Sequence, residues 1–372
     1  MISVLGAGVA GLCAATALVE AGHKVELVLP DRPPPPVSRL AGGMLAPFCE
    51  GEAAPEAVTL LGRGAIDWWS ARVPGVVRRG TLVLAPSRDS AELTRFASAT
   101  TGHEWVDPAT LEPALSGRFA RGLFYADEAH LDPVSALTTL RDTLLRQGVS
   151  TRPAPRGDWI IDCRGPAAIP DDSHLRPVRG EMLELHAPDV TLTRVARLLH
   201  PRFPCYIVPR SGNRYMIGAT MVESGDTGPV SARAMMELLS AAYTVHPGFA
   251  EAQVIATGSG LRPAFPDNLP AIRQDGTVFR LNGLYRHGFL LSPSLAADLV
   301  ARLPLPERTS PQAKTTRPPA QTEAQPSQTR TDAPTGQPPA PHPSPAAPKI
   351  KTPAADHTSN APAPEQDQSH AH

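Results

Sequence analysis

The sequence predicts an α/β fold in which a parallel-sheet domain is interrupted by a second domain built on an antiparallel sheet. Three observations predict this fold: a strand, a glycine-rich turn and a helix at the start of the chain, alternating segments in its middle, and a further strand and helix before residue 303. We expect the parallel-sheet domain to comprise residues 1–75, 130–177 and 255–306, the inserted α+β substrate domain 76–129 and 178–254, and a disordered tail 307–372.

The chain opens with an apolar strand at residues 2–5, the turn Gly6-Ala7-Gly8-Val9-Ala10-Gly11 and a helix over about residues 9–21. In such a turn the first glycine permits a tight bend, the second lets the backbone approach a pyrophosphate, and the third lets the helix pack close to the strand. Free N–H groups at the helix N-terminus favour phosphates. With a second strand at residues 24–29, the pattern predicts a Rossmann-like domain that binds a dinucleotide. A glycine-rich loop without a ligand is the alternative.

Later elements follow from the spacing of apolar residues. Four leucines predict a helix over residues 132–148, and residues 159–162 predict a short buried strand. Alternation predicts antiparallel strands at residues 80–85, 179–185, 205–209 and 214–220. Residues 278–283 predict a further strand, and the last helix is predicted to start with Ser292 as its N-cap and Pro293 in its first turn.

Composition and charge limit the classes of partner. From Glu307 to His372 the chain is rich in Pro, Ala, Thr, Gln and Ser and has no Phe, Trp, Tyr, Leu or Val, which predicts disorder. The net charge of −1 argues against nucleic acid or an anionic membrane as the main partner. The first strand leaves no room for a signal peptide and no apolar stretch is long enough to span a bilayer, so we expect a cytoplasmic protein. The four cysteines are far apart and predict neither a disulfide framework nor a metal site.

Further motifs, together with the glycine turn, carry a resemblance to a known family. They occupy residues 41–47, 127–133, 177–183, 206–210, 217–221, 260–263 and 282–293. Over most of residues 1–303 the chain resembles the flavin-dependent amine and D-amino-acid oxidases, and most closely the glycine oxidases of thiamine biosynthesis. The resemblance implies FAD as cofactor, dioxygen as acceptor, and oxidation of glycine, sarcosine or small D-amino acids to the imine or glyoxylate, ammonia and hydrogen peroxide. It also implies that the imine supplies the thiazole of thiamine, with a thiazole synthase or sulfur-carrier protein as partner, and a homo-oligomeric enzyme.

The resemblance assigns roles to side chains at matching positions. Arg262 would bind the substrate carboxylate, because a guanidinium group offers a rigid bidentate fork that lysine lacks. Tyr206 would donate a hydrogen bond to the same carboxylate, and Arg286 would lie at the flavin edge near the substrate. Met221 and Met44 would narrow the substrate cavity. For each of these residues, core packing or a structural ion pair is the alternative role.

The expected cofactor contacts extend from the glycine turn to the last helix, whose positive N-terminal end would face the flavin. They are Gly6, Gly8, Val9, Ala10, Gly11, Asp31, Ser38, Gly42, Gly43, Met44, Arg286, His287, Gly288, Phe289 and Leu290. No residue is expected to bind a metal.

Two features depart from the family pattern. The second strand ends at Leu29, where family members carry an acidic residue that accepts hydrogen bonds from the adenosine ribose, and Asp31 can substitute only if the strand end bends or the ribose shifts. Residues 149–157 are shorter than the family's β-excursion beside the adenine. Two other functions stay open: a related sarcosine or D-amino-acid dehydrogenase or oxidase, and a non-catalytic flavoprotein scaffold that docks through its tail.

Overall fold

The computed structural model describes residues 1–52, 56–199 and 203–304. By their contacts, these described residues belong to one compact unit. The predicted tail, residues 307–372, lies outside the described residues. In the described part of the chain, no helix combines the length and the apolar character needed to cross a bilayer.

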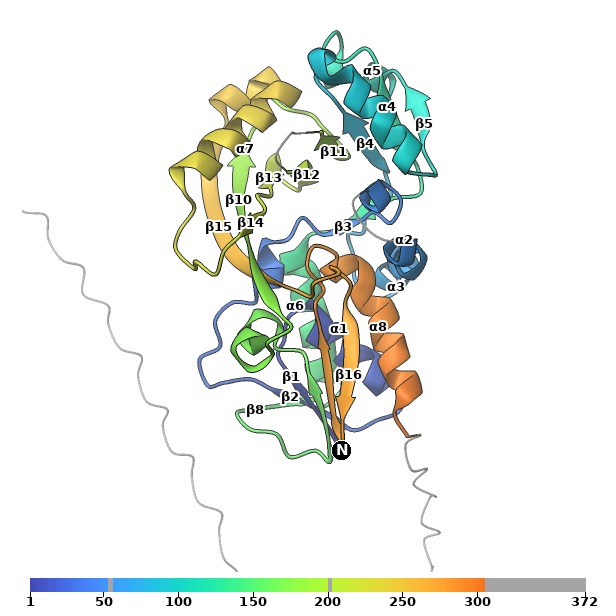
Figure 1. Ribbon diagram of the computed structural model, residues 1–372, viewed down its shortest axis with the longest axis vertical. Coiled ribbons are helices and arrows are strands. Elements are labelled where there is room, and N and C mark those ends of the chain that lie inside the picture. Colours follow the sequence, from blue (N-terminus) through green and yellow to red (C-terminus); the bar gives the residue numbers. More distant parts are fainter. Residues whose placement is uncertain (53–55, 200–202, 305–372) are drawn as a thin grey trace, which may run out of the picture. The chain divides into compact units, whose positions relative to one another are not determined.

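The expected parallel sheet contains six strands in the order β16-β17-β9-β1-β2-β8 (Figure 1). Neighbouring strands run parallel, except that β16 is antiparallel to β17. β1 and β2 are almost completely buried, because helices and loops cover the sheet. The strands are β1 (Ile2–Leu5), β2 (Val25–Val28), β8 (Ser150–Arg152), β9 (Trp159–Asp162), β16 (Ala271–Asp275) and β17 (Val278–Asn282).

Three helices share one apolar core with this sheet: α1 (Val9–Glu20), α6 (Pro133–Arg146) and α8 (Gly288–Arg302). The predicted helices at 9–21 and 132–148 are thereby confirmed, with ends shifted by one or two residues. Asp132 caps α6, because its carboxylate accepts hydrogen bonds from the N–H groups of Val134 and Ser135. Two short helices, α2 (Glu56–Gly62) and α3 (Ala65–Ser70), pack against α8.

Helix α8 begins at Gly288, so the predicted start at Ser292 is wrong. Pro293 lies inside the helix, where it lacks the N–H group that would bond the Phe289 carbonyl one turn earlier. The indole Nε1–H of Trp69 donates a hydrogen bond of 2.8 Å to that carbonyl instead. Because Trp69 satisfies the freed carbonyl, the helix can include Pro293 and begin at Gly288.

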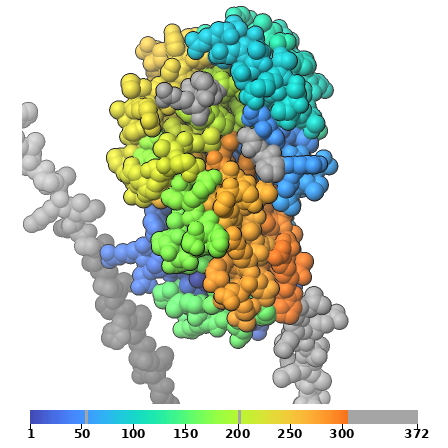
Figure 2. Space-filling view, in the orientation of Figure 1, coloured from blue at the N-terminus to red at the C-terminus, as the bar shows by residue number. Residues whose placement is uncertain are grey.

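The inserted sheet has nine strands in the order β14-β10-β13-β12-β11-β4-β6-β5, and β15 pairs with β10. All neighbours are antiparallel except β4 and β11, which confirms the expected character of this sheet. Helices α7 (Ala232–Val245) and α4 (Ser90–Ala99) pack on it and form much of the outer surface at this end (Figure 2). The strands are β4 (Thr81–Leu84), β5 (Glu104–Val106), β6 (Gly122–Tyr125), β10 (Arg176–His186), β11 (Val195–Leu198), β12 (Cys205–Arg210), β13 (Arg214–Gly218), β14 (Val222–Glu223) and β15 (Gln253–Ala264).

Strands β10 and β15 form a long antiparallel ribbon (Figure 1). The predicted domain boundaries at residues 178 and 255 fall inside these strands, so neither strand is confined to one predicted domain. A separate pair joins β3 (Met44–Leu45) to β7 (Ala129–His130). The remaining helices are α5 (Pro108–Leu111) and the 3-10 turns η1 (Val37–Leu40), η2 (Cys49–Glu52), η3 (Ser87–Asp89), η4 (Pro113–Leu115), η5 (Gly165–Asp171) and η6 (Pro247–Glu251).

Candidate active site

A cavity of about 1000 Å³ connects the glycine turn with the inserted sheet. Its walls come from the start of α1, the loop after β2, the turn η1, the strands β10, β12 and β15, and residues 281–290. Segments far apart in the sequence therefore line one cavity. We call the part beside the glycine turn the cofactor end, and the part around Tyr206 and Arg262 the substrate end.

Backbone geometry shapes the cofactor end. Gly6 has a φ of +96°, and a Cβ there would lie 2.7 Å from the carbonyl oxygen of Cys163. A Cβ at Gly11 would overlap the carbonyl oxygen of Gly6, so only glycine lets α1 pack this close to β1. The first turn of α1 carries no acidic residue, and Val9 N–H donates to Ser38 Oγ at 3.1 Å. This helix N-terminus is therefore suited to an anionic group such as a phosphate.

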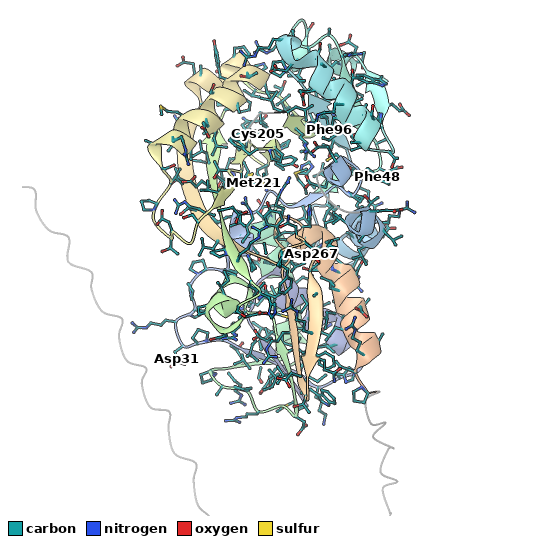
Figure 3. The ribbon with its side chains drawn as sticks, in the orientation of Figure 1. Asp31, Phe48, Phe96, Cys205, Met221 and Asp267 are labelled. Carbon is teal, nitrogen blue, oxygen red and sulfur yellow. The ribbon has the colours of Figure 1, made fainter. Side chains whose placement is uncertain are left out.

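The end of β2 differs from the family pattern in structure as it does in sequence. Leu29 is buried and lines the cavity, together with Pro30 and the prolines at 33–36. Asp31 is exposed at the periphery of the molecule and is not among the lining residues (Figure 3). The strand end does not bend Asp31 toward the cavity, so its contact with the cofactor stays a prediction that requires a shifted ribose.

At the substrate end, Arg262 projects from β15 across the β10–β15 ribbon. A Cβ on Gly180 of β10 would overlap the Arg262 guanidinium, so the glycine leaves the space that this side chain fills. The guanidinium donates to the carbonyl oxygen of Thr220 at 3.0 Å. No carboxylate among the described residues forms an ion pair with it, and burial, aided by the neighbouring cation of Arg286, lowers the pKa of Arg262 to about 10. Arg262 is thus a half-buried cation without an anionic partner in the described chain.

Glu50, which the sequence analysis did not identify, also lines the substrate end. Its carboxylate accepts a hydrogen bond from the Tyr206 hydroxyl, and Arg286 Nη2 lies 3.0 Å from Glu50 Oε2. His287 Nδ1 lies 3.6 Å from the same oxygen. Burial acts to raise the pKa of Glu50, but Arg286 and Arg197 outweigh it and lower the value to about 2. Glu50 is therefore ionised and engaged by its neighbours.

Two buried side chains hold the turn η2 that carries Glu50. Glu128 Oε1 accepts hydrogen bonds from the N–H groups of Phe48 at 2.9 Å and Cys49 at 2.7 Å. Arg197 donates to the Cys49 carbonyl and lies 3.2 Å from Glu52. Burial raises the pKa of Glu128 to about 7. Glu128 and Arg197 both bond to the backbone of Cys49, one to its N–H group and the other to its carbonyl. Glu128 and Arg197 thus set the position of Glu50.

Tyr206 has a different partner from the expected one. Its hydroxyl donates to Glu50 and accepts from Arg286 Nη2 at 2.9 Å, so its single proton is already used. Met44 lines the cavity as expected, but Met221 is not among the lining residues. The Tyr285 hydroxyl donates to the Met221 sulfur at 3.3 Å, and Tyr285 itself faces the cavity. Met221 therefore lies behind Tyr285.

A known protein family matches most of this chain. Residues 1–303 match the family model described as FAD dependent oxidoreductase. The chain belongs to this family. A Rhizobium etli protein, whose name provisionally assigns it to thiamine biosynthesis as the oxidoreductase ThiO, is 52% identical over 324 residues, which cover 84% of this chain and 99% of that protein.

Two further proteins are similar to this oxidoreductase. A bifunctional ThiO/ThiG protein of Trichormus variabilis is 26% identical over 354 residues, covering 83% of this chain and 53% of that protein. The crystal structure of glycine oxidase from Geobacillus kaustophilus matches with a TM-score of 0.68 and 25% identity, covering 81% of this chain and 93% of that one. The predicted fold class is therefore confirmed.

The cofactor of this oxidoreductase family is FAD, and the cavity fits it. The uncapped N-terminus of α1 and the close approach at Gly6 and Gly11 match the requirements of a pyrophosphate. Gly8, Val9 and Ser38 would hold that group, and residues 286–290 would hold the flavin ring.

Most predicted site residues of the oxidoreductase line the one cavity. They are Gly6, Gly8, Val9, Ala10, Ser38, Gly42, Gly43, Met44, Tyr206, Arg262, Arg286, His287, Gly288, Phe289 and Leu290. Gly11, Asp31 and Met221 are not among the lining residues. Glu50 and Met216 line it without having been predicted. The sequence held one signal for Glu50, since it is an acidic residue that closely follows the motif at 41–47.

Proposed function

We propose that this oxidoreductase deaminates glycine, or a similarly small amine with one carboxylate such as sarcosine or a small D-amino acid. The observation that carries the proposal is Arg262, a half-buried guanidinium on the cavity wall with no carboxylate partner among the described residues. A charge that is partly removed from water without a counterion is costly, and a substrate carboxylate supplies the counterion through two parallel hydrogen bonds. The products are the imine or glyoxylate, ammonia and hydrogen peroxide.

Residues 286–290 would hold the flavin of FAD, and the bound cofactor would supply the hydride acceptor for oxidation at the substrate α-carbon. The protein itself supplies position. Arg262 fixes the carboxylate and so limits which substrate atom faces the flavin. Apolar side chains, including Met44 and Met216, line the same space and reduce its access to water. Burial lowers the pKa of His287 to about 4, so this ring is neutral and adds no positive charge near neutral pH.

We further propose that the imine feeds the thiazole of thiamine, with a thiazole synthase as partner. The support is the naming of the Rhizobium etli relative and the existence of a bifunctional ThiO/ThiG protein, in which the matching region belongs to the same chain as a second activity. A sulfur-carrier protein and self-association remain predictions from the resemblance.

The test is the visible spectrum of the FAD-loaded protein, followed as amines are added without oxygen. Glycine, sarcosine, D-alanine and a bulky D-amino acid form the panel. We expect rapid bleaching by the small amines, recovery in air, and one hydrogen peroxide per amine oxidised. Recovery only with an artificial dye would assign the electrons to another acceptor. A flavoprotein that no amine reduces would overturn the proposal and favour the non-catalytic scaffold.

A further inference from the structure

Glu50 places an anion on the wall of the cavity in which we propose that the substrate binds, although the proposed substrate is itself an anion. The carboxylate is buried and lines the same cavity as Arg262. Its Oε1 accepts from the Tyr206 hydroxyl and its Oε2 lies 3.0 Å from Arg286 Nη2. The question is why a site for a carboxylate contains one of its own.

The distribution of charges around Glu50 gives the answer. Arg197 is fully buried and lies 3.2 Å from Glu52 and 3.7 Å from Glu50, and neither Arg197 nor Glu52 lines the cavity. Arg286 is matched by Glu50. Glu181 also lines the cavity, but its carboxylate pairs with Arg179 at 3.0 Å. Among these side chains, Arg262 alone is left without an anionic partner in the described chain.

Arg262 and Arg286 therefore differ in how readily they can bind the carboxylate of a ligand. Arg262 can accept a carboxylate without losing an ion pair, because its only described hydrogen bond goes to the Thr220 carbonyl. Arg286 already uses its Nη2 for Glu50 and Tyr206, and a second carboxylate at its other N–H groups would meet the like charge of Glu50. In a buried site such like charges repel strongly, because little water screens them.

From this arrangement we propose that Glu50 restricts the site to amines with a single carboxylate, by neutralising Arg286 and repelling a second acidic group. The inference rests on the proposed function and names its substrate class. Monocarboxylic amines are accepted, and amines whose nitrogen or side chain carries a further carboxylate are rejected on charge. Tyr206, which bridges Glu50 and Arg286, holds the pair in place.

The experiment compares ligands that differ by one carboxylate, using spectral changes of the oxidised FAD-loaded protein, which need no turnover. Acetate is compared with malonate and succinate. In the unmodified protein we expect the dicarboxylates to bind no more tightly than acetate. In Glu50→Gln, which keeps the hydrogen-bonding shape but removes the charge, we expect the ratio to shift at least about tenfold toward the dicarboxylates. Turnover of iminodiacetate relative to sarcosine is expected to shift in the same direction.

Two further variants isolate the cause. Glu52→Gln makes the same chemical change in the same turn, beside an arginine that does not line the cavity, and is expected to leave the ratio unchanged. The double variant Glu50→Gln with Arg286→Gln removes both charges of the pair and is expected to cancel the gain. If the gain survives in the double variant, Arg286 is not the group that Glu50 neutralises, and the proposal fails.

The unmodified protein alone can overturn the proposal, even if Glu50→Gln does not fold. Binding of malonate or succinate about tenfold tighter than acetate would mean that a second cation is already available. An unchanged ratio in a folded, FAD-loaded Glu50→Gln would also contradict it. Failure of the proposed function looks different, because neither acetate nor glycine would then perturb the flavin spectrum of the unmodified protein.

Discussion

The two ends of the cavity are lined by different kinds of protein groups. The cofactor end consists of glycines, prolines and a helix N-terminus, and its shape depends on how closely backbone segments approach one another. The substrate end consists of buried charged and hydroxyl groups, which Arg262, Glu50, Tyr206 and Arg286 bring from four different segments. The first end recognises a ligand through fixed backbone dipoles, and the second through the balance of a few charges.

This difference implies that the two ends fail in different ways. A side chain added at the cofactor end has to displace backbone, so it lowers the stability and the FAD content of the protein. A side chain changed at the substrate end alters a charge or its position, so it changes turnover while the flavin stays bound. Variants at matched positions can separate these outcomes.

The largest effect is expected from Arg262→Ala. Without the guanidinium the substrate carboxylate has no counterion, and we expect kcat/KM for glycine to fall about a thousandfold, or ~4 kcal/mol. The FAD content is expected to stay normal. Steady-state oxygen uptake and the ratio of flavin to protein absorbance measure the two quantities. Arg280→Ala, at an exposed arginine paired with Asp275, serves as control. Normal glycine turnover by Arg262→Ala would remove the carboxylate-binding assignment.

Gly11→Ala tests the cofactor end. The new Cβ would overlap the Gly6 carbonyl, so α1 must move away from β1, and we expect the free energy of unfolding to fall by ~3 kcal/mol with partial loss of FAD. Denaturant unfolding and flavin content report the change. Gly64→Ala is the matched control, because a Cβ there has no neighbour within 4 Å. Equal stability of the two variants would show that close packing of α1 is not required.

Gly180→Ala applies the same change at the substrate end. The Cβ would displace the Arg262 guanidinium, and we expect kcat/KM for glycine to fall about thirtyfold, or ~2 kcal/mol. The flavin content should match that of the unmodified protein, which distinguishes this variant from Gly11→Ala. Loss of FAD in Gly180→Ala would show that the two ends are not independent.

Glu128→Gln gives the smallest expected effect, and one that depends on pH. Burial raises the pKa of Glu128 from an ordinary 4.5 to about 7, so the stability it contributes is fully present below pH 4.5 and is lost as the pH rises through 7. Glutamine keeps an oxygen for Phe48 and Cys49 but cannot titrate. Between pH 4.5 and 8 we therefore expect the variant to gain ~2 kcal/mol relative to the unmodified protein. Unfolding curves at several pH values measure this, and a constant difference would contradict it.

The sequence was most informative where neighbouring residues determine the structure. The glycine turn, the first strands and α6 depend on residues close in the chain, and each appears where it was predicted. Helix α8 starts earlier than predicted because Trp69, 220 residues before Phe289, satisfies a carbonyl that Pro293 leaves free. Local signals cannot contain that partner.

Partners that are distant in the sequence also explain why the sequence analysis did not identify Glu50. The position of Glu50 depends on Glu128 and Arg197, which lie far along the chain and belong to the other sheet or its connections. Arg262 was identified from its motif, but only the structure tells that it is unpaired while Arg286 is paired. The motifs thus named the side chains, whereas the charge balance among them required the fold.

The β10–β15 ribbon has a mechanical consequence. It extends over 11 and 12 residues and carries Gly180 and Arg262 on facing strands. Because its two strands are hydrogen-bonded along their length, the ribbon resists bending between the two sheets. A sharp bend would break these backbone hydrogen bonds. Because Arg262 lies on this ribbon, we expect its guanidinium to keep its position when ligands enter and leave the cavity.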